Sequence, residues 1–226
     1  MLKVLIRLVA DAALVAIPLF VSAGTLAWWR GWVLVAVLLV VRTLTAVAVY
    51  QVNPTLLRER AKPPIHRDQP RTDKLLLLGI ITTGFVGLPA IVGLDVFHWH
   101  VLPRPAPLVA NLGLVLFTLG WGIQALALRA NAFATSVVRL QRERQHAVVD
   151  TGVYSIVRHP FYAGVPLVLV GMSLWLESYT AVLCAVVPIA FLVMRLILEE
   201  RFLRQELPGY SEYALRVPHR LLPGIW

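Results

Sequence analysis

The chain has little charge and almost no cysteine for its 226 residues. Charged side chains make up 15% of it, against roughly 25% in an ordinary soluble domain. The single cysteine, Cys184, excludes an internal disulfide, and inside an apolar run it is expected to be a small buried thiol. No glycine-rich fingerprint stands between a strand pattern and a helix pattern, which argues against a soluble dinucleotide-type cofactor domain.

Apolar residues dominate the composition, with 58% hydrophobic residues and a mean hydropathy of +0.74. Several apolar runs approach the roughly 20 residues that cross a bilayer core. No alternation of period two supports a barrel, so the runs are expected to be helices. We therefore predict an all-α integral membrane protein with about six transmembrane segments, the last two forming a helical hairpin: 4–27, 32–51, 74–97, 107–129, 161–176 and 179–198. Glycines within these runs predict close helix packing: Gly79, Gly84, Gly87, Gly113, Gly120 and Gly122.

Positive charge gathers in alternate polar stretches. Lysine and arginine are frequent at the start of the chain and in 52–73, 130–160 and 199–226, whereas the intervening loops hold Arg30 and Arg104. Six spans place all the basic stretches on one face, and the positive-inside rule predicts that both termini are cytosolic. We interpret the net charge of +9 as attraction to anionic lipid and expect no nucleic-acid partner.

Two ionisable residues lie inside the first two spans. Asp11 is about seven residues into the first span, and Arg42 is about nine from the cytosolic end of the second. At about 1.5 Å per residue these depths are similar. We predict that the two side chains pair, with a structural role as the favoured interpretation and a role toward a substrate as the alternative.

The first cluster of candidate functional residues stands where a polar stretch meets the fifth apolar run. Proline is favoured in the first turn of a helix, so Pro160 is predicted to begin this helix. The helix N-terminus, together with Arg158 and His159, is suited to bind an anion, and Tyr162 lies in the first turn. The simpler alternative is a set of interfacial anchors.

The second cluster lies near the end of the sixth apolar run. Arg195 and Glu199 are four residues apart and share one helix face. An ionisable residue after an uninterrupted apolar run is a functional candidate, and an interfacial ion pair is the simpler alternative. A pair of histidines, His98 and His100, lacks further ligands nearby in sequence, so no metal site is predicted.

The order of short motifs in 131–226 resembles the isoprenylcysteine carboxyl methyltransferase family, within the wider group that includes phospholipid methyltransferases. The tail spacing and the stretch Asn53–Arg60 are similar to bacterial members of that family. The motifs are, in order, Leu140-Gln141, His146-x-Val148-Val149, Gly152-Val153-Tyr154, Arg158-His159-Pro160-x-Tyr162-x-Gly164, Arg195-x-x-x-Glu199-Glu200 and Tyr210-x-x-Tyr213-x-x-x-Val217.

The resemblance implies S-adenosylmethionine as the cofactor and places Arg195 toward the substrate. It implies a single membrane domain over 1–226, with a four-helix part at 1–130 and a cofactor-binding methyltransferase core at 131–226. The loop before the hairpin and the folded-back tail would cap the cofactor pocket on the cytosolic side. The residues implied to line the cofactor site are Gln141, His146, Val148, Val149, Tyr154, His159, Tyr162 and Glu199.

The acceptor is expected to be a lipophilic small molecule or lipid that enters from the bilayer. A carboxylate acceptor is weakly favoured, because it needs no general base and its reaction with a sulfonium gains from a partly dry site. Amine, thiol and phenol acceptors stay open. The alternatives are an NADPH-dependent membrane reductase of the sterol-reductase type and a small membrane transport or scaffold protein. The expected location is a bacterial inner or plasma membrane.

Overall fold

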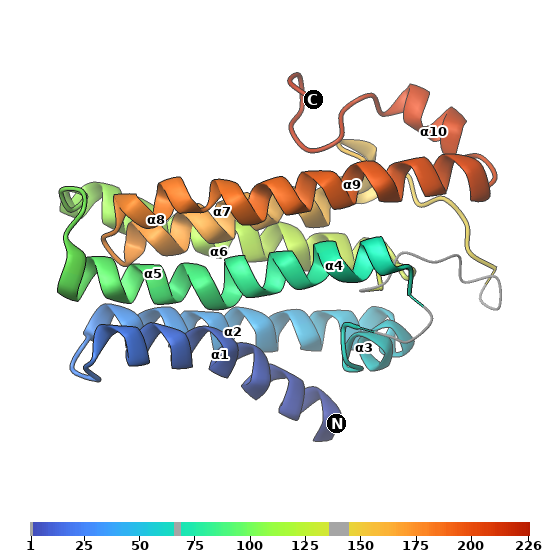
Figure 1. The fold of residues 1–226 in the computed structure, drawn as a ribbon. Coiled ribbons are helices and arrows are strands. Elements are labelled where there is room, and N and C mark those ends of the chain that lie inside the picture. Colours follow the sequence, from blue (N-terminus) through green and yellow to red (C-terminus); the bar gives the residue numbers. More distant parts are fainter. Residues whose placement is uncertain (1, 66–68, 136–144) are drawn as a thin grey trace.

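The computed structural model describes residues 2–65, 69–135 and 145–226, and in these ranges it contains helices and no strands (Figure 1). The predicted all-α fold is therefore confirmed. The long helices run side by side along one direction in Figure 1. In chain order the elements are α1 (Leu2–Ala23), α2 (Trp29–Val52), α3 (Pro54–Arg60), α4 (Arg71–Ile80), η1 (Ile81–Gly87), α5 (Leu88–Leu94), η2 (Asp95–Trp99), α6 (Pro107–Ala130), η4 (Gly152–Ser155), α7 (Pro160–Trp175), α8 (Tyr179–Cys184), α9 (Val186–Glu206) and α10 (Tyr210–Arg216).

Each predicted apolar segment is a helix or a continuous run of helical turns. In the described ranges, five segments are long and apolar enough to cross a membrane. The remaining segment, α7, is apolar but has 16 residues. The helices therefore support an integral multi-pass membrane protein, whereas a count of six spans stays a prediction. The five long segments are 2–23, 29–52, 71–99, 107–130 and 179–206.

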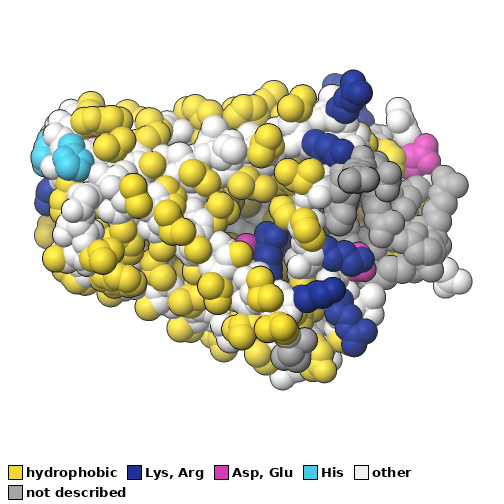
Figure 2. Space-filling model, turned by 60° about the horizontal axis from the view of Figure 1, so that its bottom comes forward, with side chains coloured by type: hydrophobic (Ala, Val, Ile, Leu, Met, Phe, Trp, Pro, Cys, Tyr) yellow, Lys and Arg dark blue, Asp and Glu magenta, His cyan; other side chains and the backbone are white. Residues whose placement is uncertain are grey.

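The polar stretches gather at one end of the bundle. Figure 1 shows α3, the start of α4 and α10 at that end, with the N-terminus lying toward it. In Figure 2, hydrophobic side chains cover most of the visible face, and most of the visible lysine and arginine side chains lie toward the same end. This is the arrangement that the positive-inside prediction requires, and the assignment of this end to the cytosol stays a prediction.

Helices α6 and α7 approach each other through glycines. A Cβ atom at Gly120 would lie 2.6 Å from the carbonyl oxygen of Gly164, and one at Gly113 would lie 2.8 Å from that of Gly171. The two helices are therefore in near backbone contact at two levels, and the predicted packing role of Gly113 and Gly120 is confirmed. Gly122 has no atom of the described residues within 4 Å of its Cβ position, so the prediction is wrong there.

Two glycines on the 71–99 segment are packed against α9. The Cβ position of Gly79 lies 3.0 Å from the ring of Phe191, and that of Gly84 lies 3.2 Å from Pro188. These contacts confirm the predicted packing role at both glycines. They also bring the start of α4, which carries Asp73, close to Arg195 in the middle of α9.

A buried carboxylate holds the turn between α7 and α8 at the opposite end of the bundle. Asp95 accepts hydrogen bonds from Ser178 Oγ at 2.6 Å, Thr180 Oγ1 at 3.0 Å and the Val101 backbone N–H at 3.0 Å. Ser178 Oγ also accepts from the Ala181 N–H and so caps α8. The hairpin is thereby fixed at its turn, which sets the position of its far end.

The predicted pair of Asp11 and Arg42 is confirmed. The Arg42 guanidinium donates to Asp11, which joins α2 to α1. Arg7 Nε lies 2.8 Å from the other carboxylate oxygen of Asp11, so two arginines share one acid. The sequence argument from equal depth found the pair but missed Arg7.

The glycine contact between α6 and α7 predicts opposite effects for two neighbouring substitutions. Gly120→Ala places a methyl group against backbone atoms of α7 and should lower the free energy of unfolding by about 1–3 kcal/mol. Gly122→Ala meets open space and should raise it by roughly 0.5–1 kcal/mol, because alanine is the better helix former. Denaturant unfolding in detergent micelles, followed by tryptophan fluorescence, measures both. Equal effects of the two variants would show that α6 and α7 are not in this close contact.

Candidate functional site

A cavity of about 580 Å³ lies between the helices near the polar end of the bundle. Side chains from α1, α2, α3, α4, η1, α6, η4, α7, α9 and α10 line it, and so do residues of the loop after α6 and of the loop before η4. Most of the lining is apolar, with a few convergent polar groups. A cavity of this size and character is typical of a site for a small molecule.

Most of the residues that the sequence assigned to the cofactor site come together at this cavity. Gln141 lies outside the described residues. The others arise from three separate stretches of the chain, so their convergence is produced by the fold. The predicted residues that line the cavity are His146, Val148, Val149, Tyr154, His159, Tyr162, Arg195 and Glu199.

Helix α7 begins at Pro160, as predicted, with His159 at its N-cap. The chain tail covers this start, since the Arg158 N–H donates to the His219 carbonyl at 2.9 Å and the His159 N–H donates to the Arg220 carbonyl at 3.0 Å. The Arg158 side chain donates to the Val217 carbonyl at 2.6 Å. The contacts of Arg158 therefore hold the tail, and the prediction that this helix start binds an anion stays a prediction.

Glu200 connects α9 to both the start of α7 and the tail. Its side chain is almost fully buried and accepts hydrogen bonds from Arg158 at 2.8 Å, Arg204 at 2.8 Å and Arg220 at 2.6 Å. A buried carboxylate is stable when it is fully paired in this way. The sequence motif contains Glu200, but it does not reveal that three arginines surround it.

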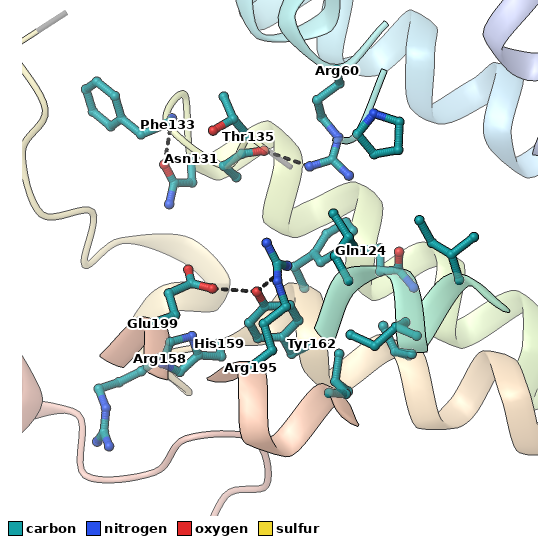
Figure 3. Close-up of a pocket in the computed structure, with 18 of the residues that line it drawn as sticks. Arg60, Gln124, Asn131, Phe133, Thr135, Arg158, His159, Tyr162, Arg195 and Glu199 are labelled. Atoms are coloured by element: carbon teal, nitrogen blue, oxygen red, sulfur yellow. Dashed lines mark hydrogen bonds between the residues drawn. The ribbon is translucent and has the colours of Figure 1, made fainter. Parts of the chain in front are cut away.

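Arg195 and Glu199 are linked through Tyr162 (Figure 3). The Tyr162 hydroxyl donates to Glu199, and Arg195 Nη1 donates to the same hydroxyl at 2.8 Å. Arg195 Nε donates to Asp73 Oδ1 at 2.7 Å. The simple i,i+4 ion pair of the sequence analysis is thus replaced by a chain of hydrogen bonds that includes Asp73 of α4. The sequence feature that could have identified Asp73 is its place as an acidic residue at the start of the third apolar run.

Burial controls the protonation of the aromatic groups at the cavity. It lowers the pKa of His159, an effect that Glu199 and Glu200 oppose, so the imidazole is neutral near neutral pH. Burial also raises the pKa of Tyr154 to about 12, which keeps its phenol protonated. The His159 ring stacks on Tyr162 with centroids 5.8 Å apart, and Tyr210 Oη lies 3.4 Å from His159 Nε2.

The loop after α6 forms another side of the cavity. His146 stacks on Phe133, with ring centroids 4.4 Å apart. Asn131 Oδ1 accepts a hydrogen bond from the Phe133 N–H at 2.8 Å, and Arg60 donates to the Ala134 carbonyl at 2.7 Å. Figure 3 shows Arg60 on the side of the pocket opposite Tyr162 and Arg195. The sequence analysis did not identify Asn131, Phe133 or Arg60 as site residues.

The comparisons with known proteins agree with the motifs. Residues 108–208 match the family model "Phospholipid methyltransferase". Protein-S-isoprenylcysteine O-methyltransferase B of Arabidopsis thaliana is 36% identical over 124 residues, which cover 54% of this chain and 59% of that protein. A probable protein-S-isoprenylcysteine O-methyltransferase of Oryza sativa subsp. indica is 38% identical over 120 residues, which cover 52% of this chain and 62% of that protein. The chain therefore matches about three fifths of the length of these relatives.

A solved structure has the same fold. It is described as the eukaryotic intramembrane Ras methyltransferase ICMT (isoprenylcysteine carboxyl methyltransferase). The likeness has a TM-score of 0.55 at 20% identity and covers 94% of this chain and 73% of that chain. These findings confirm the resemblance seen in the motif order of 131–226: residues 108–208 match the phospholipid methyltransferase model, and the plant relatives matched over about half of this chain are isoprenylcysteine O-methyltransferases by name.

Proposed function

We propose that the chain is a membrane enzyme that binds S-adenosylmethionine in the cavity and transfers a methyl group to the carboxylate of a lipophilic acceptor. The observation that carries this proposal is the convergence of motif residues from 146–199 on one cavity of about 580 Å³. The names of the plant relatives support the reaction class, since those proteins are described as O-methyltransferases of isoprenylcysteine.

The residues present suit the groups that S-adenosylmethionine carries. Glu199 is an acceptor for an ammonium group or for ribose hydroxyls. The first turn of α7, with Phe161 and Tyr162, offers backbone N–H groups that a helix leaves without intrahelical partners, and these suit a carboxylate. The rings of Tyr154 and Tyr162 are electron-rich faces that attract a cation such as a sulfonium. Gln141 stays a predicted contributor.

S-adenosylmethionine supplies an electrophilic methyl group on a sulfonium centre. Reaction of a sulfonium cation with a carboxylate anion neutralises charge, and a largely apolar cavity favours that neutralisation because water stabilises the separated charges more. A carboxylate is already deprotonated and needs no general base. Glu200 lies outside the cavity lining and is held by three arginines, which leaves it poorly suited to accept a proton from an amine or phenol.

We assign Arg195 the role of positioning the acceptor carboxylate. Its guanidinium is buried at the cavity, where Asp73 and Tyr162 fix its orientation. A guanidinium held in this way keeps a constant orientation at the cavity, which suits recognition of a planar carboxylate.

Cofactor binding is the first test of the proposal. Purified protein in nanodiscs should bind S-adenosylmethionine saturably, and Glu199→Gln and His159→Ala should each weaken the affinity by about tenfold or more, because each removes a polar contact. Glu212→Gln and His100→Ala are matched controls, since both side chains are exposed and lie outside the cavity lining. A folded wild-type protein that binds no cofactor, with or without lipid extract, would contradict the proposal.

The chemical class of the acceptor can be read from the product. Protein incubated with methyl-tritiated S-adenosylmethionine and a membrane lipid extract should transfer label to an organic-soluble product. Base treatment should release that label as volatile methanol, because methyl esters hydrolyse whereas N-methyl and phenol ether groups do not. Label that stays in the organic phase after base treatment would exclude a carboxylate acceptor, and Glu199→Gln protein provides the background.

The role of Arg195 is tested with a charge-balanced variant. Asp73→Asn combined with Arg195→Gln removes a cation and an acid together, so it leaves no lone buried charge at their contact. The KM for the acceptor should rise by about tenfold or more, because a charge-assisted hydrogen bond is lost, while the Kd of the cofactor changes less. An unchanged acceptor KM would show that the Arg195–Asp73 pair is structural.

A further inference from the structure

A second wall of the same cavity carries charge that the proposed chemistry does not use. Arg7 and Asp11 come from α1, Arg42 comes from α2 and Arg60 comes from α3, and all four line the cavity. Of these residues, Figure 3 labels Arg60, which lies across the pocket from the Tyr162 and Arg195 cluster. We call Arg7, Arg42 and Arg60 the arginine wall.

The arginine wall has more positive charge than its acidic partner balances. Asp11 is the acid that pairs with it among the described residues, and both Arg7 and Arg42 contact this one carboxylate. The contacts of Arg60 are with neutral groups, namely the Ala134 carbonyl at 2.7 Å and the Phe161 ring at 4.7 Å. Arg195 differs, because Asp73 balances its charge directly.

Burial and the crowding of these cations both affect the pKa of Arg60. Burial and the neighbouring Arg42 and Arg7 charges lower the pKa of Arg60 to about 10. Near neutral pH the side chain is still a cation, so three guanidinium groups act on one region of the cavity. An anion placed there would reduce their mutual repulsion.

Two buried donors on this side of the cavity have no partner within the described part of the chain. They are Arg42 Nε and the indole Nε1 of Trp121, and both residues line the cavity. Trp121 is only 8% exposed, and the Arg42 guanidinium lies 5.1 Å from the centroid of its ring. Buried polar groups are nearly always hydrogen-bonded in folded proteins, so an unpaired buried donor at a cavity indicates a place for a ligand acceptor.

The rest of this side is apolar and belongs to helices suited to a membrane. Leu14, Leu38, Leu77, Ile81 and Phe85 line the cavity from α1, α2 and the 71–99 segment. Figure 2 shows basic and acidic side chains next to each other within the apolar face of the bundle. An anionic group at the arginine wall would therefore have apolar surface beside it for a hydrocarbon chain.

We propose that Arg7, Arg42 and Arg60 form a carboxylate-binding subsite for the head group of an acidic single-chain amphiphile, whose chain packs on the apolar side of the cavity. The inference goes beyond the proposed function, because Arg60 of this subsite lies across the cavity from Arg195, so the carboxylate bound here is not the one that Arg195 positions for methyl transfer. It also makes a statement that stands without methyl transfer: the cavity binds a long-chain acid through these arginines whether or not the cofactor is present.

Equilibrium binding of radiolabelled palmitate to the protein in phosphatidylcholine nanodiscs tests the subsite, with empty nanodiscs as the background. Arg42→Gln and Arg60→Gln should each weaken palmitate binding by about tenfold or more. Methyl palmitate and hexadecylamine should compete poorly, because neither presents an anion. Arg58→Gln is the matched control, since it removes the same charge from α3 at an exposed position outside the cavity lining.

A charge-balanced variant distinguishes a loss of palmitate binding from a loss of folding. Asp11→Asn combined with Arg42→Gln removes one acid and one cation of the network and should still lower palmitate affinity relative to Arg58→Gln. Equal palmitate binding by wild type, Arg60→Gln and this double variant would overturn the subsite. Displacement by methyl palmitate as strong as by palmitate would do the same.

Two further measurements identify the ligand and distinguish a failure of the subsite from a failure of the proposed function. Binding of hexadecyl phosphate without binding of palmitate would overturn the carboxylate assignment and point to lipid phosphate. S-adenosylmethionine binding is measured on the same preparations. Wild-type protein that binds palmitate through the arginines but binds no cofactor would refute the proposed function and leave the acid-binding subsite established.

Discussion

The site depends on one buried carboxylate, that of Glu200. Its hydrogen bonds to Arg158 and Arg220 join the end of α9 to the start of α7 and to the folded-back tail. Breaking a buried, hydrogen-bonded charge pair typically costs about 3–5 kcal/mol, because the partner charge is left uncompensated. The tail therefore cannot leave the start of α7 without removing Arg220 from Glu200 and exposing this carboxylate. The hydrogen bonds of Glu200 therefore fix the position of the part of the cavity lining that carries His159 and Tyr210.

Glycine contacts place the charges that Glu200 connects. Near backbone contact between α6 and α7 fixes the height of the α7 N-terminus against the loop that follows α6, and this loop carries Asn131 and Phe133. The contacts of α4 with α9 bring Asp73 to Arg195 in the same way. Small residues in the apolar part of the bundle thus determine which polar side chains meet at its end.

The sequence predicts those features that depend on one segment or on depth in the membrane. Proline chemistry identified the start of α7 at Pro160, and equal depth identified the pair of Asp11 and Arg42. The ordered motifs identified most of the cavity lining of 146–199. The sequence did not predict the contact of Arg195 with Asp73, because that contact depends on the rotation of α4 against α9. For the same reason it did not assign Arg60 to the site, since Arg60 is one of many basic residues near the polar end and only the fold directs it toward the cavity.

The balance of charge across the cavity distinguishes its two walls. On one wall Asp73 neutralises Arg195, so its guanidinium is oriented and its charge is compensated before any ligand arrives. On the other wall three partly buried guanidinium groups face one acid, and an excess of like charge in a partly dry site is unfavourable unless it is paired. A carboxylate at the second wall would gain mainly electrostatic energy, whereas a carboxylate at the first wall would gain mainly directional hydrogen bonding. Attraction and orientation are thus supplied by different arginines, and a neutral or cationic amphiphile would lose the first of these contributions while the apolar lining stayed the same.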